Sequence, residues 1–293
     1  MTLTHSFIAE SKKNRANHEV KGSETFDKSQ KETLTMNRRR SVFVAAALLI
    51  VGLGTTLIAR AAVEDGLAAR WLFNESYGIT ARDSGGAGLD GTLFSSAFFT
   101  NDPDRGNVLF VNGASGEVQF PNNTKLKPNT GTISVWVKPD LDRTADIVRQ
   151  PTDRLIGCDM TGNFYAFGLR VTDKGGPVAI LANDDRKTCS RKPQVVLNGS
   201  AKSVRAGQWT HLVMRWDGSK LALFANGKSV GSTSYVPNPT LGLSYSGTEP
   251  MKVGAALWDM GAGYLEYFGK VSDLRIYSRP LSDSEIQDIP NGR

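Results

Sequence analysis

The sequence predicts an all-β protein built as a two-sheet antiparallel sandwich, and three observations support this. The chain has 30 glycines and 12 prolines in 293 residues, with turn residues separating short apolar runs, as in sandwiches of short strands. No long amphipathic helix occurs after residue 66. Residues 209–228 carry the pattern of two consecutive hairpins. Strands rather than helices are therefore expected to build the core.

The first 61 residues are expected to be separate from this sandwich. Residues 1–35 are polar and rich in Lys, Glu, Ser, Thr and Asn, which is typical of a disordered extension. Three arginines at 38–40 then precede an apolar run over 41–59, and Ala59-Arg60-Ala61 fits a small-x-small cleavage site. Residues 36–61 are therefore predicted to form an N-terminal apolar helix, either a cleaved signal peptide or a retained transmembrane anchor.

Two features of this leader leave alternatives open. The apolar run is longer than the roughly 7 to 15 residues usual in a signal peptide, which keeps the membrane anchor as an alternative. Met36 stands directly before the arginines, so translation from Met36 instead of Met1 would give a compact leader. Residues 39–43 also fit a twin-arginine export pattern. On each alternative, the domain after residue 61 is expected outside the cytoplasm, secreted or anchored in the membrane.

The central strands are predicted most directly from residues 209–228. Two sets of side chains alternate from Trp209 to Trp216, and the set with Leu, Met and Trp suits a buried sheet face. A return strand follows, and Asn-Gly is the residue pair that tolerates positive φ in a tight hairpin turn. The first turn, the return strand and the second turn are predicted at 217–218, 221–225 and 226–227.

This combination of aromatic positions and turns resembles the central hairpins of the laminin-G-like, concanavalin-A-like jelly-roll family, a secreted and mostly carbohydrate-associated module. The resemblance implies one jelly-roll domain over residues 66–290, in which the middle, 140–206, matches poorly. Ser282 and Glu285 have capping-box spacing in a segment similar to the family's short terminal helix, 279–286. Segments similar to the other strands and loops of the family are 69–75, 81–86, 88–93, 110–113, 118–121, 131–139 and 267–277.

The positive charge of the chain belongs mainly to its leader. Residues 1–61 hold ten of the 35 lysines and arginines and five of the 29 aspartates and glutamates, so the remainder has a net charge of about +1. That remainder has no basic stripe with interleaved aromatic residues and no RNA-binding motif. A glycan or a cell-surface protein is therefore expected as the partner, and nucleic acid is not.

Cys158 and Cys189 lie in the part that the family resemblance covers least. An even number of cysteines in an exported domain favours a disulfide. The bridge would tie the ends of a strand pair between them and would stabilise the fold by about 3 to 4 kcal/mol in the chain-entropy model. Two separate buried thiols are the alternative.

The sequence favours a protein without catalytic activity. Enzymes of the resembled family that cleave β-glucans carry Glu-x-Asp-x-x-Glu on one strand, which places two carboxylates on the same sheet face. This chain has no such motif, and it has no Gly-x-Ser-x-Gly. His211, the one histidine after residue 61, is expected to be a partly buried strand residue and not a general base.

Candidate sugar-binding residues occur in the glycine-rich segment 257–269. Trp258 and Tyr264 carry flat, partly apolar rings that can stack on a sugar, and Asp259 and Glu266 can accept hydrogen bonds from hydroxyl groups. The alternative is that Trp258 and Tyr267 are core or edge residues. The other four tryptophans are expected in the core: Trp71, Trp136, Trp209 and Trp216.

The family resemblance also implies a structural calcium ion held by oxygen ligands. It would lie between the opening loop, residues 81–86, and the closing strand, residues 267–277. Asp83 and Asp273 stand at the comparable positions. The family commonly has an aspartate just before the second position, where this chain has Ser272. The alternative role for Asp83 is to accept hydrogen bonds from the amides of its own turn.

Two main classes of function follow. The first is a non-catalytic module that binds carbohydrate or mediates cell-surface adhesion, and the missing carboxylate motif favours it. The second is a glycoside-active enzyme of the same fold with unfamiliar carboxylates. A structural surface protein that binds another protein is a third possibility, because a fold alone does not determine function.

Overall fold

The structure is a computed structural model of the chain. It describes residue 36 and residues 64–291 except 114–115, 152–164, 183–193, 237–242, 244, 246–247, 255–257 and 260–262. The predicted leader helix, apart from Met36, and both cysteines lie outside the described residues. Among the residues that are described, no helix has the length and apolar character needed to span a bilayer. The chain separates into two units, residues 1–59 and 60–293, and the fold below belongs to the second.

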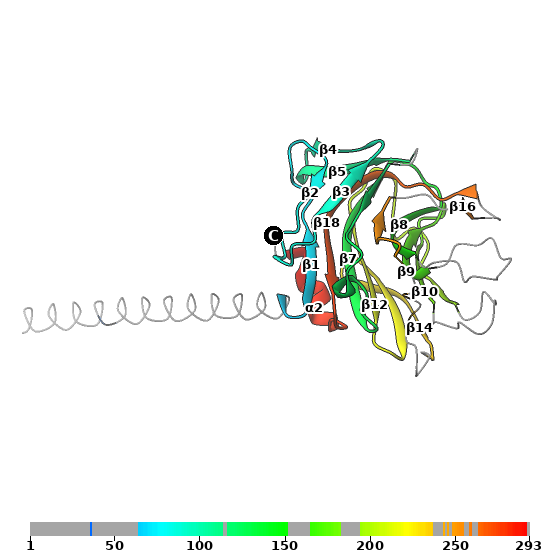
Figure 1. Cartoon of the computed structure of the whole chain (residues 1–293). Helices are drawn as coiled ribbons and strands as arrows, with labels where there is room; N and C mark the ends of the chain where they lie inside the picture. Colours follow the sequence, from blue (N-terminus) through cyan, green and yellow to red (C-terminus); the bar gives the residue numbers. More distant parts are fainter. Residues whose placement is uncertain are drawn as a thin grey trace, which may run out of the picture. The chain divides into compact units, whose positions relative to one another are not determined.

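Two antiparallel sheets build this unit, as the sequence predicts (Figure 1). Sheet A runs in the order β14 (Lys228–Ser234), β13 (Lys220–Ala225), β12 (Thr210–Trp216), β7 (Gly131–Pro139), β18 (Phe268–Tyr277), β5 (Gly106–Asn112) and β4 (Ala97–Asp102), and β1 (Leu67–Trp71) also pairs with β18. Sheet B runs in the order β11 (Gln194–Asn198), β10 (Pro177–Ala182), β9 (Tyr165–Val171), β8 (Ala145–Pro151), β15 (Lys252–Val253), β6 (Glu117–Gln119), β3 (Gly91–Phe94) and β2 (Thr80–Ala81).

The core lies between the two sheets and confirms the sandwich. Trp71 and Trp216 of sheet A are fully buried. The ring of Trp216 packs on Phe167 of sheet B at a centroid distance of 5.7 Å, and Trp71 packs on Phe120 at 4.1 Å. Burying such large rings between both sheets supplies much of the hydrophobic stabilisation.

The predicted double hairpin is confirmed as β12, β13 and β14. The Asp217 carboxylate accepts hydrogen bonds from the backbone amides of Ser219 and Lys220 at 2.8 and 2.7 Å, which fixes the first turn. Asn226 and Gly227 have φ values of 49° and 76°, as a tight primed turn requires. Leu212, Met214 and Trp216 face the core, so the predicted alternation holds for this strand.

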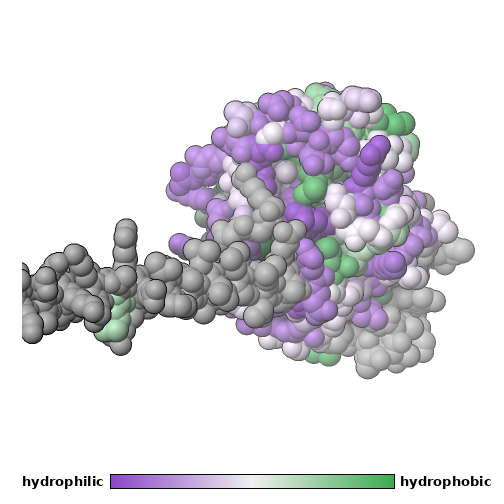
Figure 2. Space-filling view, turned by 90° about the vertical axis from the view of Figure 1, so that its left-hand side faces the viewer, coloured by the Kyte–Doolittle hydropathy of each residue, from purple (hydrophilic) through white to green (hydrophobic). Residues whose placement is uncertain are grey.

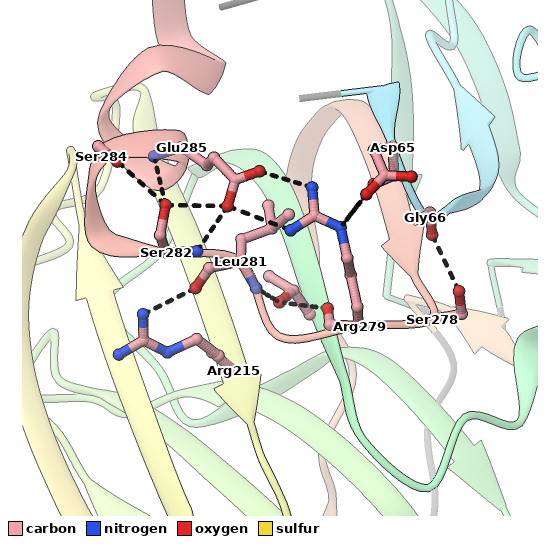
Figure 3. A network of polar contacts seen from close by, with 10 residues as sticks. Asp65, Gly66, Arg215, Ser278, Arg279, Leu281, Ser282, Ser284 and Glu285 are labelled. Atoms are coloured by element: carbon pink, nitrogen blue, oxygen red, sulfur yellow. Dashed lines mark hydrogen bonds and ion pairs between the residues drawn. The ribbon is translucent and has the colours of Figure 1, made fainter. Parts of the chain in front are cut away.

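The end of the chain packs beside the start of the domain (Figure 3). Ser282 and Glu285 form the predicted capping box of α2 (Asp283–Asp288). The Arg279 guanidinium pairs with Glu285 at 2.5 Å and donates from Nε to the Asp65 carbonyl at 2.9 Å. The Ser278 amide donates to the Gly66 carbonyl at 2.9 Å. These contacts join the first strand to the terminal helix. Two 3₁₀ turns complete the described elements, η1 (Thr124–Leu126) and η2 (Ile289–Asn291).

The surface seen in Figure 2 is mainly hydrophilic, with apolar residues in small separated patches. Large apolar side chains that are exposed in the described part include Tyr77, Ile79, Phe94 and Phe98. Isolated exposed apolar residues are normal on soluble surfaces, so they do not by themselves mark a site.

Candidate functional site

The predicted sugar-binding segment forms a small hairpin of its own. Its strands β16 (Trp258–Asp259) and β17 (Gly263–Tyr264) are antiparallel, with Trp258 opposite Tyr264 and Asp259 opposite Gly263. Residues at directly opposite positions of an antiparallel pair are close neighbours across the ribbon. The register therefore brings together the two aromatic residues that the sequence singled out.

The residues on either side of this segment are hydrogen-bonded to β8. The Gly254 amide donates to the Ile147 carbonyl, and the Asp146 amide donates to the Leu265 carbonyl, each at 3.0 Å. Leu265 is 1% exposed and anchors the second end in the protein. Gly254 and Leu265, which flank the segment, thus lie beside Ile147 and Asp146 of β8.

Tyr267, the third ring of the segment, belongs to the core. It is 1% exposed and lies in the main core cluster, and its hydroxyl donates to the Lys270 carbonyl at 3.1 Å. This agrees with the core alternative that the sequence left open for Tyr267. Glu266 is half-buried next to it.

A polar cluster of Asp146, Tyr165 and Arg170 lies next to the base of the hairpin, on the face of sheet B turned away from the core. Tyr165 Oη donates to Asp146 Oδ2 at 2.6 Å, and Arg170 Nε donates to Asp146 Oδ1 at 2.7 Å. Arg170 Nη2 also lies 3.3 Å from Tyr165 Oη. A β-carbon at Gly168 would lie 3.3 Å from the Tyr165 ring, so the missing side chain leaves room for that ring.

The electrostatics of this cluster keep Tyr165 protonated. Burial raises the pKa of the Tyr165 phenol well above its ordinary value, and the negative charge of Asp146 raises it further. A phenol in this state donates a hydrogen bond and is a poor nucleophile. Tyr165 therefore serves to orient Asp146.

Further polar residues continue along the same face of sheet B. The register places Lys252 between Arg149 on one side and Gln119 on the other. Lys252 Nζ pairs with Glu117 Oε1 at 3.3 Å, and the Gln119 side-chain amide also donates to Glu117. The segment 254–265 is thus held beside a row of polar residues, of which Asp146, Arg149 and Tyr165 are buried and Glu117, Gln119 and Lys252 are half-buried.

Two of the tryptophans expected in the core lie instead on the outer face of sheet A. Trp136 and Trp209 are half-buried, and the Arg105 guanidinium lies 4.0 Å from the Trp136 ring and 5.2 Å from the Trp209 ring. Because these rings pack against a cation of the protein itself, we assign them a structural role.

Asp102 links several strands on the same outer face of sheet A through its hydrogen bonds. It is 1% exposed and accepts hydrogen bonds from Lys138 at 3.1 Å, Lys270 at 2.7 Å and the Trp209 indole at 2.9 Å. Although burial alone would raise the pKa of Asp102, these donors lower it strongly. Asp102 therefore ties the end of β4 to β7, to β18 and to the segment before β12.

His211 is fully buried on this face, where the sequence predicts a partly buried strand residue. Its Nε2 lies 2.7 Å from the Ser134 hydroxyl, and its ring packs on Trp136 at a centroid distance of 5.2 Å. Burial lowers the pKa of His211 to about 3. A neutral, enclosed imidazole is not placed to act on a substrate from solvent.

The two aspartates implied as calcium ligands are both engaged by groups of the protein itself. The Asp273 carboxylate is paired with two arginines, Arg70 at 2.8 Å and Arg275 at 2.6 Å. Asp83 accepts hydrogen bonds from backbone amides, including that of Gly85 at 2.8 Å, as its alternative role requires. Within the described ranges, no group of three or more acidic, histidine or cysteine side chains is arranged to hold a metal.

The comparison with family models places the chain among known folds. The model Laminin_G_3, described as the concanavalin A-like lectin/glucanases superfamily, matches residues 112–287, more than half of the chain. No curated protein gives a significant match.

Solved structures with a similar fold include binding domains and enzymes. The binding domain of Paraclostridial Mosquitocidal Protein 1 has a TM-score of 0.55 and 15% identity, over 77% of this chain and 52% of that one. Domain 4 of AbnA, a GH43 extracellular arabinanase from Geobacillus stearothermophilus, in complex with arabinotriose, has a TM-score of 0.52 and 19% identity, over 76% and 97%. A Trypanosoma rangeli sialidase has a TM-score of 0.54 and 15% identity, over 76% and 32%. The chain thus spans about half of the toxin domain and a third of the sialidase.

Proposed function

This chain belongs to the concanavalin A-like lectin/glucanase superfamily, and from that premise we propose that it is a non-catalytic module that binds carbohydrate outside the cytoplasm. The observation that carries the proposal is the register of the β16–β17 hairpin, which sets Trp258 opposite Tyr264. The hairpin is rooted on β8 beside the polar face of sheet B. We propose that this aromatic pair, with Asp259 and Glu266 of the same segment, forms the sugar-binding site.

The chemistry of the hairpin suits a sugar ring. One face of a pyranose presents C–H groups, and flat aromatic rings with few torsions can stack on it with little loss of side-chain entropy. Carboxylates accept hydrogen bonds from sugar hydroxyl groups. We assign the stacking to Trp258 and Tyr264 and the hydrogen bonding to Asp259 and Glu266.

The similar structures support a binding role through their own ligands. The arabinanase domain was solved with arabinotriose, and this chain covers nearly all of that domain. A botulinum neurotoxin binding domain of similar fold was solved with SialylT, at a TM-score of 0.54 and 12% identity over 78% of this chain. At such low identity the likeness shows the fold alone, so the ligand of this chain is inferred from its own hairpin.

The polar face of sheet B supports binding over catalysis. Glycoside hydrolysis generally needs two free carboxyl groups, one to donate a proton and one to attack or activate water. Asp146 is engaged by Tyr165 and Arg170, and Glu117 is engaged by Gln119 and Lys252. We therefore propose that these carboxylates stabilise sheet B rather than react.

Replacing Trp258 or Tyr264 by alanine is expected to weaken glycan binding by about 1 to 3 kcal/mol, on the scale of aromatic stacking on flat rings. The measurement is calorimetric titration with a glycan that the wild-type protein binds, together with the midpoint of thermal unfolding. Tyr77→Ala is the matched control, because Tyr77 is an aromatic residue that is 86% exposed and lies in the segment before β2. Unchanged affinity in both hairpin variants would contradict the assignment, and a large loss of stability would show that these rings are core residues.

The leader is expected to direct the domain out of the cytoplasm. The arginines at 38–40, the apolar run and Ala59-Arg60-Ala61 support export through a signal peptide or an anchor. N-terminal sequencing of the native protein should find Ala62 as the first residue if the leader is cleaved, or an intact leader in the membrane fraction if it is retained. A full-length protein in the cytosol would contradict both. The bridge between Cys158 and Cys189 also stays a prediction for the exported domain.

A further inference from the structure

The junction of the opening loop and the closing strand is held by an ionic cluster of Arg70, Asp273 and Arg275. Arg70 lies on β1, which pairs with β18, the strand that carries Asp273 and Arg275. Arg70 donates from Nε to Asp273 Oδ1 at 2.8 Å and from Nη2 to Oδ2 at 3.1 Å. Arg275 donates from Nε to Oδ1 at 3.0 Å and from Nη2 to Oδ2 at 2.6 Å.

These four hydrogen bonds use the full accepting capacity of the Asp273 carboxylate, because a carboxylate has about four lone-pair sites. The cluster also holds two positive charges against one negative charge. A divalent cation placed at this carboxylate would therefore meet repulsion in a site where Asp273 is 7% and Arg275 4% exposed. Although burial raises the pKa of Asp273, the hydrogen bonds from Arg275 and Arg70 lower it to about 2.

Asp83, the other expected ligand, is engaged by its own loop. Its Oδ1 accepts hydrogen bonds from the amides of Arg70 at 3.1 Å and Gly85 at 2.8 Å, and its Oδ2 accepts one from the amide of Leu89 at 3.1 Å. Three of its four accepting sites are therefore taken by backbone N–H groups. The carboxylate stabilises the loop directly.

Arg70 makes the connection that a bridging cation would otherwise make. Its backbone amide donates to Asp83 Oδ1, and its carbonyl accepts a hydrogen bond from the Ser84 amide at 2.6 Å. Its side chain reaches Asp273 on the closing strand. One residue thus contacts both the loop and the strand.

We infer that the guanidinium groups of Arg70 and Arg275 replace a metal ion at this junction, so that the domain joins its opening loop to its closing strand without a divalent cation. Bidentate arginine–carboxylate pairs have fixed geometry and direct charge compensation, which suits a permanent structural link. The inference concerns stability and does not depend on the proposed sugar site.

Thermal unfolding of the full chain tests this directly. The unfolding midpoint is expected to be the same in millimolar calcium chloride and in excess EDTA. Arg70→Leu is expected to lower the midpoint by about 5 to 10 °C, because it removes two of the four hydrogen bonds to the buried Asp273 carboxylate. Arg82→Leu is the matched control, since Arg82 is an exposed arginine of the same loop, and its midpoint should stay unchanged. If Arg70→Leu does not fold, Arg70→Lys replaces it, with a smaller expected loss because lysine cannot form the bidentate pair.

Two results would overturn the inference. One is a calcium-dependent rise of the wild-type midpoint that disappears in Asp273→Asn, because this would place a cation at the carboxylate. The other is an Arg70→Leu protein that is as stable as the wild type, because Arg70 would then not provide the link.

Discussion

Replacing Trp216 by alanine is expected to lower the free energy of unfolding by about 3 to 5 kcal/mol. Trp216 is fully buried and contacts Phe167 of the opposite sheet. It also fills the space above Gly131, where even a β-carbon would come within 2.9 Å of its ring. Alanine therefore leaves a cavity between the sheets. For a domain of this size the unfolding midpoint should fall by roughly 6 to 20 °C.

Trp209→Ala is the comparison for this prediction. Trp209 is half-buried outside sheet A and contributes one hydrogen bond to Asp102 and a contact with Arg105. Its loss is expected to be smaller, about 1 to 2 kcal/mol. Chemical denaturation of both variants measures the difference. An equal or larger loss for Trp209 would contradict the assignment of the core to the space between the sheets.

Acidification from pH 7 to pH 5 is expected to remove about 2 kcal/mol of stability through His211. Burial lowers its pKa in the folded state to about 3, and the positive charges of Arg275 and Arg105 act in the same direction, against Asp273. In the unfolded chain the pKa returns to 6.5. Below pH 6.5 the unfolded state therefore binds the proton and the folded state does not, so stability falls as the pH falls. Continued to pH 3, the loss would reach about 4 to 5 kcal/mol.

The loss of stability through His211 occurs at higher pH than the loss through the carboxylates. Asp273 and Glu285 have pKa values lowered to about 2 in the folded protein. Their contribution to stability is therefore lost only as the pH falls below their ordinary pKa values of 3.8 and 4.5. His211→Gln cannot take up a proton and keeps a polar group near Ser134. Unfolding free energies measured by denaturant at several pH values should lose their slope between pH 7 and 5 in this variant. A flat wild-type profile over that range would contradict the buried, neutral imidazole.

Local features of the fold were predictable from the sequence because neighbouring residues determine them. The Asn226-Gly227 turn depends on two residues that accept positive φ, and the Ser282–Glu285 capping box depends on a spacing of three. Both are present in the structure. The sequence also singled out Trp258 and Tyr264 as candidate binding residues, and their pairing across a small hairpin is a finding of the structure.

The polar face of sheet B was not predictable in the same way. Every residue of β8 is buried, because both faces of this strand are covered, and the alternation that identifies a half-buried strand is therefore absent. A register irregularity between Gln150 and Pro151 changes which residues share a face with Asp146. Neither property is visible in the order of residues 140–206.

The arginine partners of Asp273 were not predictable from the sequence for a related reason. Asp273 has the residue type and position of a cation ligand, but its charge is compensated by Arg70, which lies 203 positions earlier in the chain. Only the pairing of β1 with β18 brings these two residues together. Similarly, Trp136 lies outside the core because its neighbours Val135 and Val137 occupy the core-facing positions of β7.

Binding of the purified protein to a glycan array, with Trp258→Ala and Tyr77→Ala beside the wild type, tests whether the β16–β17 hairpin binds sugar. We expect the wild type and Tyr77→Ala to bind the same class of glycan, and free sugar of that class to compete. Trp258→Ala should lose most of the signal while its unfolding midpoint is unchanged. A folded wild-type protein that binds no glycan, or a Trp258→Ala protein that binds as well as the wild type, would contradict it.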